Sequence, residues 1–188
     1  CEDIPEGTAA AIARELVGFF HDRLIVQLKD SGVRHDVIKA VIANGDDDLV
    51  RIVARAKAVQ AFIETEDGKN LLIAYKRAAN ILAIEEKKDK SIFKFEELHT
   101  STLKEEVEII LATVHLPDFR KALDQLANEE RFSEAMSALA QLRQPVDLFF
   151  DKIMVNCEDK ELRANRLRLL ASIRDNMNQV ADFSKIEG

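Results

Sequence analysis

Turn-forming residues are scarce in this sequence of 188 residues, which contains six glycines and three prolines. Alanine, leucine, isoleucine, glutamate and lysine abound instead, and they favour long helices over the short strands of a β-sandwich. No apolar run reaches about eighteen residues, and the start does not read as a secretory signal. We therefore expect a soluble, cytoplasmic protein with no membrane-spanning segment.

Cysteine is equally rare. Cys1 and Cys157 are too few for a disulfide framework and show no CxxC spacing, so we expect a reducing compartment and two inert thiols. The chain begins at Cys1 without a methionine, and residues 1–7 resemble a linker. These features predict a fragment of a longer polypeptide.

Motifs of catalysis are also missing. There is no glycine-rich phosphate loop, no GxSxG and no Cys/His pair in a recognisable context. His21-Asp22 is the dipeptide most suggestive of a metal site, but the remaining histidines have no ligand spacing, so we interpret His21 as a surface or boundary residue. The sequence predicts a non-catalytic chain with no metal or cofactor of its own.

Apolar residues recur at three- and four-residue intervals throughout the chain, which predicts an all-α, multi-helix bundle. A turn is expected at Asp67-Gly68, a capping box at Thr102 and Glu105, and a helix start at Pro117. The expected helices cover approximately residues 8–30, 35–43, 46–64, 70–87, 102–115, 117–128, 133–142, 145–156 and 159–180.

The formal charge of −7 argues against a generic nucleic-acid binder, because sequence-independent affinity comes mainly from neutralising phosphates. The charge is unevenly distributed, however. Residues 69–90 carry six basic and three acidic side chains, and residues 149–188 carry seven of each, so two islands, residues 69–90 and 152–174, escape the acidic background. These two basic islands are the places where a binding surface is expected.

The first island falls on the helix expected over residues 70–87. A helical wheel puts the core arc on one side and gathers Lys76, Arg77 and Asn80 on the other, together with Ile73 and Ile84. One interpretation is a solvated strip with ion pairs to neighbouring helices. The other is an RNA contact, in which the cations hold phosphates and the amide bonds to a base edge.

The second island falls on the last helix. Arg166 lies inside its core stripe, where an arginine requires a carboxylate partner, so we predict a structural ion pair. Arg163 and Arg174 lie at the edge of the stripe, where their stems can pack while their heads reach outward. Arg168 is expected to be exposed. The four arginines thus do not form one face.

Aromatic residues make up only 6% of the chain, with no tryptophan and one tyrosine. Recognition of single-stranded RNA commonly uses exposed rings on which bases stack. Tyr75 lies on the inner arc of its helix and is expected in the core. Phe93 and Phe119 are weaker candidates for a stacking role.

Several separated strings resemble one family. "GKNLLIAYKRAANIL" (68–82), "ALAQLRQPVDLFFDKIMVNCEDKELRANRLRLLASI" (138–173) and "VADFSKI" (180–186) are similar to the C-terminal part of the beta subunits of bacterial glycyl-tRNA synthetases. "FFHDRL" and "ARAKAVQAF" resemble the segment that precedes that part. The resemblance spans nearly the whole chain.

The resemblance implies a ligase of two alpha and two beta subunits, in which the alpha subunit holds the site for glycine, ATP and Mg and the beta subunit binds tRNA-Gly. It also implies a domain similar to the helical anticodon-binding domain of arginyl-tRNA synthetases, often named after a DALR tetrapeptide. That tetrapeptide is absent, and Glu161-Leu162-Arg163 is only a partial echo.

We therefore expect an N-terminal helical segment over residues 1–65 and an anticodon-binding domain over residues 66–188. The predicted RNA contacts are Lys76, Arg77 and Asn80, with Arg163, Arg168 and Arg174 as a second group. The rival hypothesis is a subunit-interaction module that docks the alpha subunit and never touches RNA.

Overall fold

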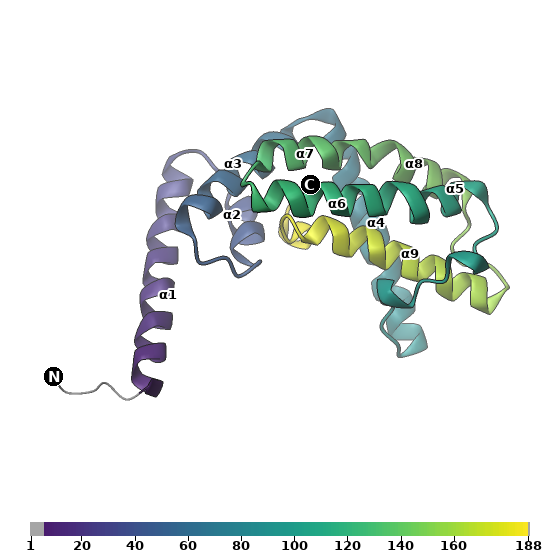
Figure 1. Cartoon of the computed structure of the whole chain (residues 1–188), viewed down its shortest axis with the longest axis horizontal. Coiled ribbons are helices and arrows are strands. Elements are labelled where there is room, and N and C mark those ends of the chain that lie inside the picture. The colour runs from purple at the N-terminus through teal and green to yellow at the C-terminus, as the bar shows by residue number, and fades with distance from the viewer. Residues whose placement is uncertain (1–5, 188) are drawn as a thin grey trace.

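Every regular element that the structure describes is helical, which confirms the all-α prediction (Figure 1). The structure, a computed structural model, describes residues 6–187, apart from the side chains of residues 6–10, 13 and 14. The α-helices are α1 (Glu6–Asp30), α2 (His35–Ile42), α3 (Leu49–Glu64), α4 (Glu66–Asp89), α5 (Glu106–Ile110), α6 (Leu116–Asn128), α7 (Phe132–Gln141), α8 (Arg143–Lys152) and α9 (Lys160–Asn178). Short elements are the 3₁₀ turns η1 (Phe95–Glu97), η2 (Thr100–Thr102) and η4 (Phe183–Lys185) and the π-helical turn η3 (Leu111–His115).

Helix α4 is the centre of the fold, because α3, α8 and α9 all pack against it. In Figure 1, α6, α7 and α9 lie in front of α4, and α6 packs against both α7 and α9. Leu71 and Leu82 of α4, Leu139 of α7, Phe149 of α8 and Leu170 of α9 are fully buried in this core. The core leaves one side of α4 facing outward.

Helix α1 projects from one end of the helical body (Figure 1). Leu24 and Leu28, in its C-terminal half, are buried, and α1 packs against α2 and α3. In the chain from residue 6 to 187, no helix is both long enough and apolar enough to cross a membrane.

Capping carboxylates stand at the start of two long helices, α3 and α9, which begin within three residues of the predicted positions. Asp48 accepts hydrogen bonds from the amides of Val50 and Arg51 at the start of α3, and Asp159 does the same for α9. The turn expected at Asp67-Gly68 is wrong. Helix α4 begins there, capped by the hydroxyl of Thr65, which accepts a hydrogen bond from the Gly68 amide at 3.0 Å.

Gly68 marks a close approach of backbones and not a turn. A Cβ atom at this position would lie 2.0 Å from the carbonyl oxygen of Phe62. The absence of a side chain therefore lets α4 start directly after α3 ends, which a count of turn residues cannot reveal.

The capping box expected at Thr102 and Glu105 is also wrong. Thr102 lies in a 3₁₀ turn, and the reciprocal bonds join Glu105 and Glu108 at the start of α5. Helix α5, the π-helical turn and α6 then form one continuous helical run, in which Pro117 stands at the start of α6 as expected.

The C-terminal tail connects the first helices to the rest of the chain. The amide of Asp182 donates to the carbonyl of Ala40 at 2.9 Å, and the amide of Glu187 donates to the carboxylate of Asp36 at 2.7 Å. Helix α3 also packs against α4 and α7. Residues 35–64 thus lie against the C-terminal helices, whereas most of α1 does not.

Candidate nucleic-acid interface

The outer face of α4 carries the first predicted group of RNA contacts. Taking about 100° per residue, Arg77, Asn80 and Ile84 all lie within about 40° of Ile73 around the helix axis. Arg77 and Asn80 are exposed, Lys76 is half-buried at the side of the stripe, and both isoleucines are 65% exposed. The structure therefore brings the three predicted residues together on one open surface.

The positive charges of Lys76 and Arg77 are not neutralised by a carboxylate of the described chain. Within residues 6–187, Lys76, Arg77 and Asn80 form no ion pair and no side-chain hydrogen bond. The Arg77 guanidinium lies over the ring of Phe150 from α8, 4.4 Å from its centroid. This contact positions the group and leaves its N–H donors free. Phe150 escapes sequence reasoning, because the wheel of one helix carries no information on its neighbours.

Arg163 and Arg174 lie on the other side of α4. Arg163 donates to Glu85 and, at 2.7 Å, to Asp89, and Arg174 lies 3.7 Å from Glu86. The hydrogen bond from Arg163 outweighs burial and holds the pKa of Glu85 below its ordinary value. The expected outward-reaching heads are thus wrong, since Arg163 is held by two carboxylates of α4, and Arg174 by Asp175 of its own helix at 2.8 Å beside Glu86 of α4.

Arg168 and Arg166 are paired as well. Arg168, expected to be exposed, is largely covered and lies 3.4 Å from Glu97 of η1. Arg166 is buried and donates to both carboxylate oxygens of Glu108, from Nε at 2.6 Å and from Nη2 at 3.2 Å. The structure thus has Arg166 in an ion pair, and the helical wheel of α9 alone could not identify Glu108.

The two basic islands do not share one face. Measured from Ile73, the carboxylates of Glu85, Glu86 and Asp89 lie at about 120° to 220° around α4, opposite the stripe of Arg77 and Asn80. The RNA contacts predicted for Arg163, Arg168 and Arg174 stay predictions. An RNA phosphate at these residues would compete with carboxylates that already hold them.

Within residues 6–187, no exposed aromatic ring accompanies the α4 face. Tyr75 is buried as expected, and its hydroxyl donates to the side chain of Asn178 at 2.9 Å. Phe93 and Phe119 are buried too, so their suggested stacking role is wrong. A loop RNA could reach isoleucine side chains here but none of these three rings.

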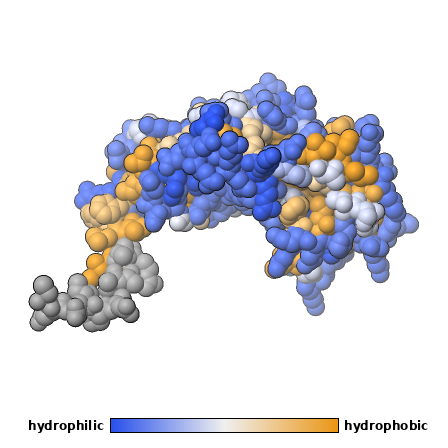
Figure 2. All heavy atoms as spheres, in the orientation of Figure 1, coloured by the Kyte–Doolittle hydropathy of each residue, from blue (hydrophilic) through white to orange (hydrophobic). Residues whose placement is uncertain are grey.

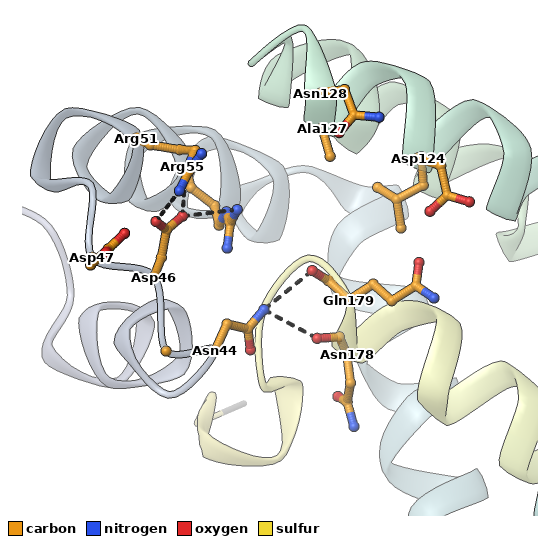
Figure 3. Close-up of a pocket in the computed structure, with 12 residues that line it drawn as sticks. Asn44, Asp46, Asp47, Arg51, Arg55, Asp124, Ala127, Asn128, Asn178 and Gln179 are labelled. Carbon is orange, nitrogen blue, oxygen red and sulfur yellow. Dashed lines mark hydrogen bonds and ion pairs between the residues drawn. The ribbon is translucent and has the colours of Figure 1, made fainter.

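A depression lies elsewhere, between the start of α3, α6 and the end of α9 (Figure 3). Its volume is about 670 Å³. Arg51 and Arg55 line it, yet both bind Asp46, and the hydrogen bond from Arg51 lowers the pKa of that carboxyl. Asp47 and Asp124 add further negative charge. This depression does not suit an anion.

The described chain also holds no group of three or more His, Cys, Asp or Glu side chains arranged for a metal ion.

Comparison with known proteins defines the class of this helical module. The family of the DALR anticodon binding domain matches residues 71–187, which include α8, α9 and α4 from Leu71 onward. The chain belongs to this family, although it lacks the tetrapeptide of the name.

The relatives narrow the resemblance further. The chain is 50% identical over 186 residues to the glycine–tRNA ligase beta subunit of Rhodospirillum centenum, covering 98% of this chain and 26% of that protein. It is 49% identical over 177 residues to the glycine–tRNA ligase beta subunit of Phenylobacterium zucineum, covering 94% of this chain and 26% of that protein. The chain thus spans about a quarter of the length of these relatives, and the resemblance inferred from the sequence is confirmed.

Proposed function

We propose that this chain binds the anticodon arm of glycine tRNA as part of a cytoplasmic glycine–tRNA ligase. The observation that carries the proposal is the open stripe of α4, which lies within the matched anticodon-binding region and presents unpaired Lys76 and Arg77. In this proposal an alpha subunit performs the ATP- and Mg-dependent attachment of glycine, in an assembly of two alpha and two beta subunits. The chain itself contributes recognition.

The chemistry of the stripe suits a loop of folded RNA. Lys76 and Arg77 neutralise phosphates, Asn80 offers both donor and acceptor to a base edge, and the exposed isoleucines cover apolar faces of ribose or base. Because the chain carries a net charge of −7, the affinity of this surface alone is modest. Linkage to other tRNA contacts in the ligase raises it through effective concentration.

The test is a salt titration of tRNA binding. Replacing Lys76 and Arg77 by Glu should weaken binding of glycine tRNA and lower the slope of log K against log salt by about 1 to 2. The matched control replaces Lys39 and Lys57 by Glu, because these exposed lysines lie on α2 and α3, outside the matched region. Equal binding and equal slopes for the two double variants would refute the proposal.

A second candidate function, docking of a partner protein such as the alpha subunit, is favoured by α1. Ile12, Leu16, Phe19 and Phe20 of α1 are between 46% and 54% exposed. Figure 2 shows apolar surface along this projecting part of the molecule. An exposed apolar patch of this kind often marks a protein–protein interaction site. Replacing Leu16 and Phe19 by Ser should reduce co-purification with the alpha subunit under this hypothesis and leave tRNA binding unchanged.

A further inference from the structure

A depression of about 260 Å³ opens between α4 and α8, directly beside the proposed RNA stripe. Arg77 and Phe150 form one part of its lining, and Asp147, Asp151 and Asn70 supply polar groups. This volume is just below the range of pockets for drug-sized ligands, which suits a single small ring. Because it adjoins Arg77, a base splayed from an RNA bound along α4 would meet it first.

The two carboxylates of the depression differ in what they can still bind. Asp147 lies 3.4 Å from Arg143, which also binds Asp67 at 2.8 Å. Asp151 is exposed and forms no ion pair or side-chain hydrogen bond within the described chain. Its acceptor oxygens are therefore open to a ligand.

Asp151 has no evident role in stability. It lies one residue before the C-terminal end of α8, where the helix dipole disfavours a negative charge. Arg77, by contrast, is fixed over the Phe150 ring, so its free N–H groups can donate into the same depression. Asn70 is half-buried and adds a second donor. The depression thus combines one open acceptor with two donors.

This combination matches the edge of cytosine, which presents an amine donor at N4 beside acceptors at N3 and O2. Uracil has a carbonyl oxygen in place of the amine, and a carboxylate would repel it. Glycine codons begin with two guanines, so every glycine anticodon carries two cytosines. We propose that Asp151 is a specificity-determining residue, which accepts a hydrogen bond from the N4 amine of one of these cytosines. This inference rests on the proposed function.

The experiment measures the affinity of the whole chain for glycine tRNA transcripts. In these transcripts the cytosine at the second anticodon position, the one at the third position, or both are changed to uracil. For the unchanged protein, one of the single changes should reduce affinity about 5- to 100-fold, as for one good base contact. For Asp151→Asn and Asp151→Ser, the ratio of the affinity for the cytosine transcript to that for the uracil transcript should fall toward one. The affinity for the uracil transcript should not fall. Asp22→Asn, an exposed residue of α1, is the control and should keep the original ratio.

Failure of this inference is distinguishable from failure of the proposed function. If the cytosine preference is the same in Asp151→Asn as in the unchanged chain, while the Lys76 and Arg77 charge reversal still weakens binding, then Asp151 is not the reader and the RNA stripe stands. If that charge reversal has no effect, the proposed function itself falls. Absence of any cytosine preference in the unchanged chain would also overturn the inference.

Discussion

Replacing Arg166 by Met tests the buried ion pair between Arg166 of α9 and Glu108 of α5. The Glu108 side chain is 0% exposed, and its carboxylate accepts from Arg166 and from the amides of Lys104 and Glu105, at 2.7 and 2.9 Å. Arg166→Met leaves the carboxylate buried with only the two amides as partners. Removing one partner of a buried pair costs about 3–5 kcal/mol, a large part of the roughly 5–15 kcal/mol of a typical domain.

The loss of stability in Arg166→Met should depend on pH in a defined way. Burial alone would raise the pKa of Glu108, but the hydrogen bonds from Arg166 and the two amides outweigh it, so this pKa lies below its ordinary value. The pair therefore stabilises the fold fully above the ordinary glutamate pKa and loses this contribution as pH falls through the lowered value. In Arg166→Met the pKa rises instead, so protonation relieves the penalty. The difference in stability between the two proteins should shrink as pH falls from 7 to below the ordinary glutamate pKa.

Urea unfolding followed by circular dichroism measures both effects, provided that the m-values agree. Adding Glu108→Gln to Arg166→Met removes the buried charge and should recover at least about 1 kcal/mol. Arg131→Met is the matched control, since Arg131 pairs with Glu129 and Glu134 at the surface, and it should cost less than about 1 kcal/mol. A loss below about 1 kcal/mol for Arg166→Met at pH 7, or a loss that does not change with pH, would refute the reasoning.

Three further changes test local features of the fold by thermal or urea unfolding. Gly68→Ala forces a Cβ against the Phe62 carbonyl and should destabilise by at least about 1–3 kcal/mol; a neutral effect would show that the two helices separate easily. Asp48→Ala removes the cap of α3 and should cost about 1 kcal/mol, whereas Asp48→Asn should retain most of the stability. Tyr75→Phe removes the bond to Asn178 and should cost about 1 kcal/mol with tRNA binding unchanged; a specific loss of binding would instead give the hydroxyl a role in recognition.

Local signals predict much of this fold. The apolar periodicity and helix-start signals predict helices from about residues 46 and 159, close to the starts of α3 at Leu49 and α9 at Lys160. The errors arise where distant segments decide the outcome. Gly68 reads as a turn residue until the Phe62 carbonyl occupies the space of its side chain.

The residues of the candidate site likewise fall into those that a local pattern can place and those that it cannot. One helical wheel suffices to place Arg77 and Asn80 on the outer face of α4, because both side chains are exposed in the described chain, with only the edge of α8 beside them. The arginines of α9 could not be assigned in this manner. The carboxylates that hold Arg163 and Arg168 lie 78 and 71 residues away along the sequence, so their pairing depends on packing that no local pattern encodes.

Photochemical cross-linking from position 80 tests the central claim most directly. A photoreactive amino acid replaces Asn80 in the full-length ligase bound to glycine tRNA, and the same group at position 39 is the control. The outer face of α4 should cross-link to the anticodon arm, and position 39 should not. Cross-links from position 80 to the alpha subunit or to the acceptor arm, with none in the anticodon arm, would contradict the account.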